Sequence, residues 1–347
     1  MNWPVPSPRE SYSRRGWANY VLVGEIACSL VRRRLNLYNR VPLNLMTKSP
    51  PGSKLLDVLR KRVSSLIAEG RMEEALRVAQ TAADAARRQV SGGDAPARTL
   101  VSFLLTLADL QRALDDHAGA ERSYLEGLRW SEDAGEPAVF EVARLQAGLA
   151  SLYDFTGRES EAAPLYAAAI HALDALGADG QLEAAYLHNN LAMILKGEGD
   201  FVLAEQHYRA ALKAFQVGLG LTSTTVATVL NNLGGLYTFM SRPEEAAEMH
   251  QKALEIRQDS DGRNTPDQAQ SLSNLAAVFH REGDFARAQR YYEQARHLFE
   301  RDVRGVEADY AIAMRNFAAL YREQGDEAQA SATEDAARAR LGDRWQE

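Results

Sequence analysis

The stretch from Leu187 to Phe215 reads LHNNLAMILKGEGDFVLAEQHYRAALKAF and decides the fold of this 347-residue chain. The pattern returns 42 residues later, from Val229 to Ile256, as VLNNLGGLYTFMSRPEEAAEMHQKALEI. Further copies in the same register run from Ser271 to Phe299 and from Met314 to Arg340. A fixed period of this size predicts stacked repeat units, each contacting its neighbours, in place of one globular core.

Each copy is predicted to form two amphipathic helices joined by a tight turn. Leu191, Ala192 and Leu195 share one face of the first helix, because positions three and four apart are neighbours on a helix. Gly199 can adopt the left-handed conformation that ends this helix, and Asp200 can cap the next one. Small residues recur in the second helix at Ala120, Ala162, Ala204, Ala246, Ala288 and Ala330, and the positions four later hold Tyr124, Tyr166, Tyr208, His250, Tyr292 and Glu334.

This pattern of small residues and aromatics resembles the tetratricopeptide repeat. The spacing, the NNLA and NNLG openings, and the segment ALEIR at Ala253–Arg257 look like the kinesin light chain type. The resemblance covers roughly residues 55–340 and implies an all-α, right-handed α-solenoid of about seven helix-turn-helix units. We expect an N-terminal extension at 1–53 that is disordered or loosely docked, a superhelix at 54–341 and a C-terminal tail at 342–347. The units of the superhelix are expected near 55–89, 101–130, 143–172, 185–216, 227–258, 269–300 and 311–340.

The charge is distributed unevenly along the chain. The net charge is −7, but residues 1–50 hold eight Lys/Arg and two acids, so this segment is +6 and the rest is −13. An acidic body argues against nucleic-acid binding, which needs a basic face. Cys28 is the single cysteine, which excludes an intrachain disulfide and agrees with a cytoplasmic location.

The N-terminal segment lies outside the repeats and allows several interpretations. The apolar run from Trp17 to Val31 is too short to span a membrane and contains Glu25. The segment could be a disordered or loosely docked extension, a membrane-surface helix or a signal sequence, so membrane contact is expected only through residues 1–45. Translation could also start at Met46, just before the repeats.

The sequence predicts no catalytic machinery. No phosphate-binding glycine loop, nucleophile motif or dinucleotide-binding motif is present, and the seven histidines form no metal-binding pattern. We therefore expect a non-enzymatic protein without cofactor or metal.

An asparagine ladder marks the candidate binding face. In tetratricopeptide domains the first helices line the concave face, and the resemblance places one asparagine per unit there, with a second beside it in two units. The ladder consists of Asn189, Asn190, Asn231, Asn232, Asn274 and Asn316. An amide both donates and accepts hydrogen bonds, so such a ladder could hold the backbone of an extended peptide. Alternatively, each amide bridges to a neighbouring helix.

Basic residues around this ladder predict the chemistry of the ligand. The positions assigned to the groove include Arg144, Lys196, Arg281, Arg315 and Arg322. Two acids, Asp154 and Glu323, leave the groove with a charge of +3, which favours an acidic or carboxylate-bearing peptide. These charges could instead form ion pairs within the chain.

These features together predict a protein-protein interaction scaffold that binds an extended peptide segment in its concave groove. A peptide-responsive regulatory sensor and a non-catalytic subunit of a larger assembly are the alternatives. The partner is expected to be a protein or peptide and not a nucleic acid. The sequence predicts neither the identity of this partner nor the oligomeric state.

Overall fold

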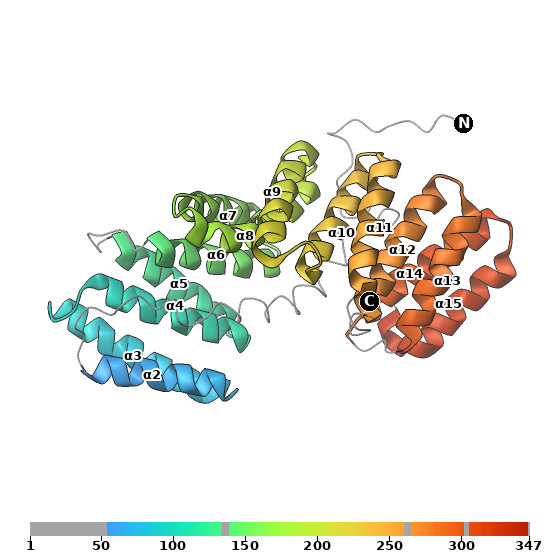
Figure 1. The fold of residues 1–347 in the computed structure, drawn as a ribbon. Helices are drawn as coiled ribbons and strands as arrows, with labels where there is room; N and C mark the ends of the chain where they lie inside the picture. Colours follow the sequence, from blue (N-terminus) through green and yellow to red (C-terminus); the bar gives the residue numbers. More distant parts are fainter. Residues whose placement is uncertain (1–53, 133–138, 260–264, 302–304, 346–347) are drawn as a thin grey trace. The chain divides into compact units, whose positions relative to one another are not determined.

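The computed structural model describes residues 54–132, 139–259, 265–301 and 305–345, and the predicted N-terminal extension lies outside this part. The described residues form fourteen α-helices, one 3-10 helix and no strand (Figure 1). The helices follow one another in seven pairs: α2 (Lys54–Ala68) and α3 (Met72–Ser91), α4 (Ala97–Ala113) and α5 (His117–Glu132), α6 (Val139–Phe155) and α7 (Glu159–Asp174), α8 (Ala178–Glu198) and α9 (Phe201–Leu219), α10 (Thr224–Phe239) and α11 (Pro243–Asp259), α12 (Thr265–Arg281) and α13 (Phe285–Arg301), α14 (Glu307–Glu323) and α15 (Glu327–Leu341).

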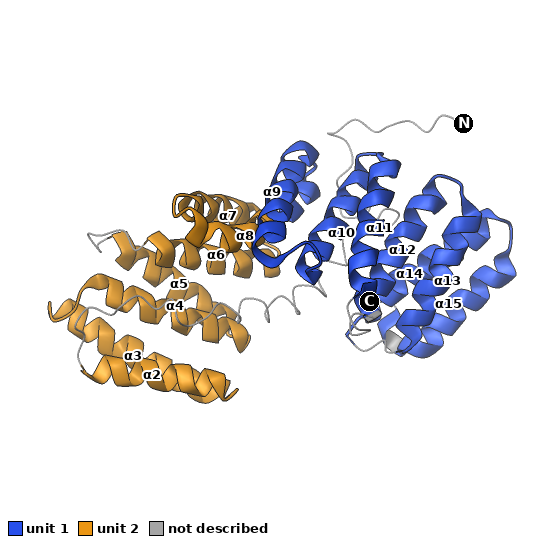
Figure 2. Cartoon of the chain, viewed as in Figure 1, with its two compact units in different colours: residues 1–33, 192–347 blue, residues 34–191 orange. Residues whose placement is uncertain are grey.

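The chain divides into two compact units, and the boundary falls inside α8 (Figure 2). The described residues up to Leu191 form the first unit along the chain, orange in Figure 2, and those from Ala192 onward form the second unit, blue in Figure 2. Within each unit the pairs stack in sequence order, which confirms the predicted all-helical repeat fold. The second helix of one pair contacts the first helix of the next, as α3 does with α4 and α13 with α14.

All seven turns within the pairs share one backbone motif. A residue with positive φ ends the first helix, and the N–H of the next residue donates to a carbonyl five residues earlier, as Asp200 does to Leu195 at 2.9 Å. The positive-φ residues are Gly70, Asp115, Gly157, Gly199, Ser241, Gly283 and Gly325. The left-handed glycine predicted before Asp200 is therefore confirmed, and aspartate or serine takes its place in two other turns.

The residue after the positive-φ position is of two kinds. Aspartate occupies it in four turns, and its carboxylate accepts the N–H three residues later, as Asp200 does from Leu203 at 3.1 Å. Arginine occupies it in the other three turns and pairs instead with a glutamate three residues later. These pairs are Arg71 with Glu74, Arg158 with Glu161 and Arg242 with Glu245.

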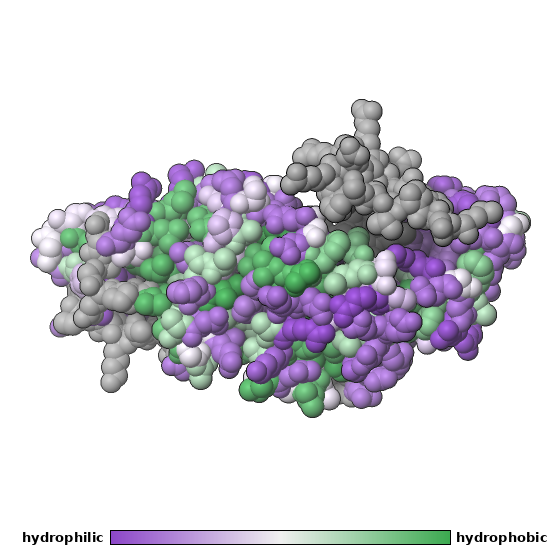
Figure 3. Space-filling model, turned by 90° about the horizontal axis from the view of Figure 1, so that it is seen from above, coloured by the Kyte–Doolittle hydropathy of each residue, from purple (hydrophilic) through white to green (hydrophobic). Residues whose placement is uncertain are grey.

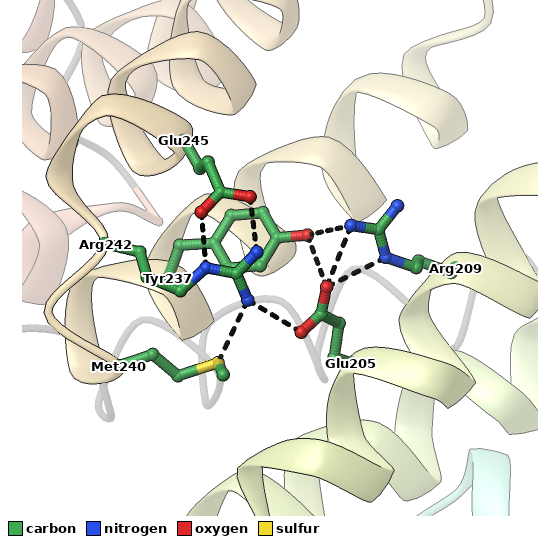
Figure 4. A network of polar contacts seen from close by, with 6 residues as sticks. All are labelled: Glu205, Arg209, Tyr237, Met240, Arg242 and Glu245. Atoms are coloured by element: carbon green, nitrogen blue, oxygen red, sulfur yellow. Dashed lines mark hydrogen bonds and ion pairs between the residues drawn. The ribbon is translucent and has the colours of Figure 1, made fainter.

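Two of the arginine turns are locked by the same network, which we call the turn network. Figure 4 shows Arg242 stacked over the Tyr237 ring, 4.3 Å from its centroid, and paired with Glu245 and with Glu205 of the preceding pair. The Tyr237 hydroxyl donates to Glu205 at 2.9 Å. The same four contacts recur 84 residues earlier among Arg158, Tyr153, Glu161 and Glu121.

The core of each unit is built from the residues predicted to pack. The alanines of the second helices are fully buried, and the aromatic four positions later is at most 1% exposed in five pairs. In the last pair Glu334 replaces this aromatic and accepts from Arg322 at 2.8 Å. The predicted C-terminal tail is described as far as Trp345; Gly342–Trp345 forms a 3-10 helix that packs Trp345 against the core of the second unit.

Candidate functional site

The asparagine ladder lies where consecutive pairs meet. At the ladder position of α6, Gly148 faces the ring of Tyr124, and a Cβ there would come within 2.5 Å of it. In α8 the same position holds Asn190, whose amide donates to the Tyr166 hydroxyl at 3.4 Å. The ladder therefore borders the packing aromatic of the preceding pair.

Five of the six ladder asparagines are at most 8% exposed, and only Asn232 is half-buried. Asn231 joins three elements: its oxygen accepts from Asn274 at 3.2 Å and from His250 at 2.7 Å, and its amide donates to Gln270 at 3.3 Å. Burial, with a smaller contribution from the Arg257 charge, lowers the pKa of His250 to about 3, so the imidazole is neutral and Nδ1–H is the donor. These amides bridge repeats, and their binding of a peptide backbone stays a prediction.

Two of the predicted groove cations are paired with acids of the chain. Arg144 lies 3.3 Å from Asp109 and 3.6 Å from Glu183. Arg322 binds Glu334 at 2.8 Å and Glu327 at 3.2 Å. Their charge is partly compensated, which reduces what they offer to an acidic ligand.

A third cation, Arg315, is committed to the C-terminal end of the described chain. Its guanidinium donates to the carbonyl of Trp345 and lies 4.9 Å from the centroid of that ring. Both contacts fix the 3-10 helix onto α14, so this arginine has a structural part in the last pair.

The two remaining cations, on α8 and α12, contact adjacent residues at the carboxyl-terminal end of α10. Lys196 lies with Nζ 5.5 Å above the ring of Phe239, which is 38% exposed. The exposed Arg281 donates to the carbonyl of Thr238 at 3.0 Å. A cavity of about 210 Å³ opens beside this bond; Thr238, Arg281 and the acidic Glu282 line it, whereas Lys196 and Phe239 do not. We call Lys196, Thr238, Phe239 and Arg281 the Lys196–Arg281 site.

The electrostatics of this site favour an anion. Burial lowers the pKa of Lys196 from 10.5 to about 8, so its ammonium is poorly solvated yet still mostly charged at neutral pH. Among the described residues no carboxylate lies within 4.0 Å of this ammonium or of the Arg281 guanidinium. A ligand carboxylate there would find two cations beside an aromatic ring.

Sequence reasoning missed Phe239 as a member of the site. Its signal is weak, because it lies at the end of its helix, where the repeat holds Gly197 and Arg281 in the neighbouring pairs. Only the structure shows that its exposed ring lies beneath the Lys196 ammonium.

The described residues were compared with two further kinds of site, a metal centre and a membrane span. No group of three or more His, Cys, Asp or Glu side chains in this part of the chain could hold a metal ion. None of the helices described is both long and apolar enough to cross a lipid bilayer.

Known proteins share this repeat. The sequence profile of the family described as Tetratricopeptide repeat matches residues 183–259 and 267–341. Protein KINESIN LIGHT CHAIN-RELATED 1 of Arabidopsis thaliana is 30% identical over 125 residues, which are 36% of this chain and 20% of that protein. The chain thus spans about a fifth of the length of this curated relative.

Solved structures extend the likeness to the fold. The crystal structure of BtubC (BKLC) from P. vanneervenii is 33% identical, with a TM-score of 0.56, over 65% of this chain and 90% of that one. NprR in complex with its cognate peptide NprX has a TM-score of 0.56 at 14% identity, over 86% of this chain and 82% of that one. The turn motif, the packing positions and these matches agree, and the chain therefore belongs to the tetratricopeptide-repeat family, with repeats of the kinesin light chain type.

Proposed function

We propose that this protein is a non-catalytic, cytoplasmic interaction scaffold that binds an extended, acidic or carboxylate-bearing peptide segment. The Lys196–Arg281 site is the centre of this proposal, and the half-buried Asn232 is the ladder asparagine best exposed to a peptide backbone. The buried ladder members would act by holding the repeats in register.

The observation that carries the proposal is that two cations contact adjacent residues of α10 and pair with no carboxylate of the described chain. Arg144 and Arg322 show that this protein usually pairs its basic side chains with its own acids. Lys196, which is half-buried, departs from this rule in spite of the desolvation cost that lowers its pKa to about 8. A bound carboxylate would offset that cost.

The comparisons support peptide binding at the level of the fold. NprR, whose fold is similar, was crystallised with its cognate peptide. The kinesin light chain type of repeat in BtubC and in the Arabidopsis relative agrees with an interaction role.

The first test measures peptide binding by the full-length chain. A fluorescent peptide of alternating Glu and Gly, and its counterpart of alternating Gln and Gly, would be titrated by anisotropy. We expect only the acidic peptide to bind, and the Lys196→Gln, Arg281→Gln double variant to weaken it at least about tenfold. Arg290→Gln is the matched control, since Arg290 is exposed and belongs neither to the site nor to the lining of its cavity. Equal binding by the double variant and the wild type would refute the site.

The pH dependence of the same titration provides a second test. Lys196 is charged below its pKa of about 8 and loses its charge as the pH rises through that value. We therefore expect affinity for the acidic peptide to fall severalfold between pH 7 and pH 9.5 in the wild type. Lys196→Gln should bind weakly with a flat profile, and a pH profile identical to that of the wild type would contradict the role of Lys196.

A further inference from the structure

A larger cavity, of about 560 Å³, lies between α9 and α11 with α10 as its floor; we call it the α9–α11 groove. Its apolar wall includes Leu212, Leu230, Leu233, Met249 and Ile256. The turn network closes one end, because Tyr237, Arg209 and Glu245 also line it (Figure 4). The groove shares no lining residue with the Lys196–Arg281 site.

One side chain distinguishes the groove from the equivalent place in the next pair. There the position of Met249 is held by Tyr291, whose ring stacks on Phe279 with centroids 5.6 Å apart and planes 10° apart. Methionine is narrower and flexible, so it leaves the corresponding space open and can adapt to an incoming group.

Apolar side chains also collect beside the groove on the surface. Leu221, which lines it, is 67% exposed, and Val217 on α9 is 76% exposed. On the face seen in Figure 3, hydrophobic side chains form separate patches between strongly hydrophilic ones. Such an apolar surface next to a cavity is a docking feature.

The charge around the groove is acidic on the α11 side. This helix carries Glu244, Glu245, Glu248, Glu255 and Asp259, of which Glu245 pairs with Arg242 and Glu248 with Lys252. Its only exposed cation is Lys252, because Arg257 is 1% exposed. The groove therefore fits an apolar segment that is flanked by positive charge.

We propose that residues 17–34 of the same chain occupy the α9–α11 groove. The run from Trp17 to Val31 carries a single charged residue, Glu25, and Arg32–Arg34 follow it directly. The groove extends along α11 from Glu245 to Ile256, a helical length of about 16 Å, which is comparable with about 22 Å for a fifteen-residue segment if helical. Residues 35–53 supply a tether that reaches up to about 65 Å when extended.

The occupant makes both kinds of contact that the groove offers. Its apolar side chains would cover the surface around Met249 and Leu221, and its three arginines would face the glutamates of α11. This goes beyond the proposed peptide binding, because it assigns a different surface to a different ligand. It also gives the basic N-terminal segment a place on the acidic repeat array.

The single native cysteine allows a direct test in the full-length chain. Cys28 lies within the proposed occupant and would be labelled with benzophenone maleimide, irradiated, and its crosslinks mapped by mass spectrometry. We expect intrachain crosslinks concentrated on residues 209–256. Crosslinks concentrated elsewhere, crosslinks between two copies of the chain, or a yield no higher than in denaturant would each overturn the proposal.

A groove-filling variant completes the test. Met249→Tyr introduces the residue that fills the equivalent space in the next pair, so it should keep the fold while excluding the segment. We expect it to reduce the mapped crosslinks at least about tenfold and to make Cys28 react several times faster with a thiol reagent. Ser331→Tyr, on the exposed surface of α15, should change neither measurement. Unchanged crosslinking in Met249→Tyr would overturn the proposal.

Discussion

A single position in the first helix of each pair decides how closely consecutive repeats approach. In α6 this position is Gly148, which lets the Tyr124 ring lie against the helix backbone. In α8 it is Asn190, which reaches the Tyr166 hydroxyl through a hydrogen bond. Close contact and a polar bridge are two solutions to the same packing problem.

Gly148→Ala should therefore destabilise the protein. The new Cβ would lie within 2.5 Å of the Tyr124 ring, and overpacking of this kind costs about 2 kcal/mol, more than the gain in helix propensity returns. Gly197→Ala is the matched control: a Cβ at this position would have no atom within 4 Å, and the variant should gain about 0.5 kcal/mol. Urea unfolding followed by circular dichroism would compare them, and equal midpoints would contradict this account.

The sequence predicts packing residues better than polar ones. Ala204 and Tyr208 could be placed in the core because their type and period both indicate burial. The asparagine ladder could be aligned, but its burial depends on contact with an aromatic residue of the preceding pair. The small residue Gly148, at the same position in α6, was the only sequence feature that pointed to this contact. The ion pair between Arg144 and Asp109 joins residues 35 positions apart, and the repeat pattern does not predict such a pairing.

The turns within the pairs show two ways of ending one helix and beginning the next. Asp200 caps α9 through its carboxylate, whereas Arg242 leaves the backbone uncapped by its side chain and joins α9, α10 and α11 through the turn network. The sequence predicted the first kind from the Gly-Asp dipeptide. The second kind could not be predicted from the segment Ser241-Arg242-Pro243, because Glu205, the partner of Arg242, lies in the previous pair.

Arg242→Ala should cost more than the loss of an ordinary surface charge. It removes two ion pairs and a stacked guanidinium at once, for which we expect about 1–2 kcal/mol of lost stability. Arg290→Ala removes an exposed arginine and should change stability by less than about 0.5 kcal/mol. Thermal unfolding of both variants at low and high salt would check this, and an Arg242→Ala effect as small as that of Arg290→Ala would disprove the network's contribution.

At the scale of the whole molecule, stability is expected to be local, because within each unit a pair contacts its neighbours in the stack. The clearest staple in the second unit is Arg257, buried on α11, which donates to the Asp267 carbonyl at 2.7 Å and to the Ser271 hydroxyl at 2.6 Å. Asp309 of α14 is also buried, and its carboxylate stabilises the positive charge of Arg257. Three consecutive pairs therefore share one buried polar cluster.

Arg257→Leu should loosen this part of the array and leave the distant part unchanged. Removing one member of a buried charge cluster leaves carboxylates without compensation and costs about 3 kcal/mol. We expect hydrogen exchange followed by mass spectrometry to accelerate in α11–α14 and to stay unchanged in α2–α5. Gly148→Ala should give the opposite distribution, and uniform acceleration by either variant would contradict local stability.

The turn network also makes neighbouring repeats complementary without making them interchangeable. Glu121 and Glu205 lie in pairs with an aspartate turn, and each receives the arginine of the pair that follows, Arg158 or Arg242. Loss of the fourth pair alone would set Arg242 against the third pair, which has Ala163 in place of this glutamate. Loss of the third and fourth pairs together, a block of 84 residues, would instead set Arg242 against Glu121 and preserve the contact. From the second pair to the fifth, the module by which this array can be shortened or recombined is consequently the double repeat.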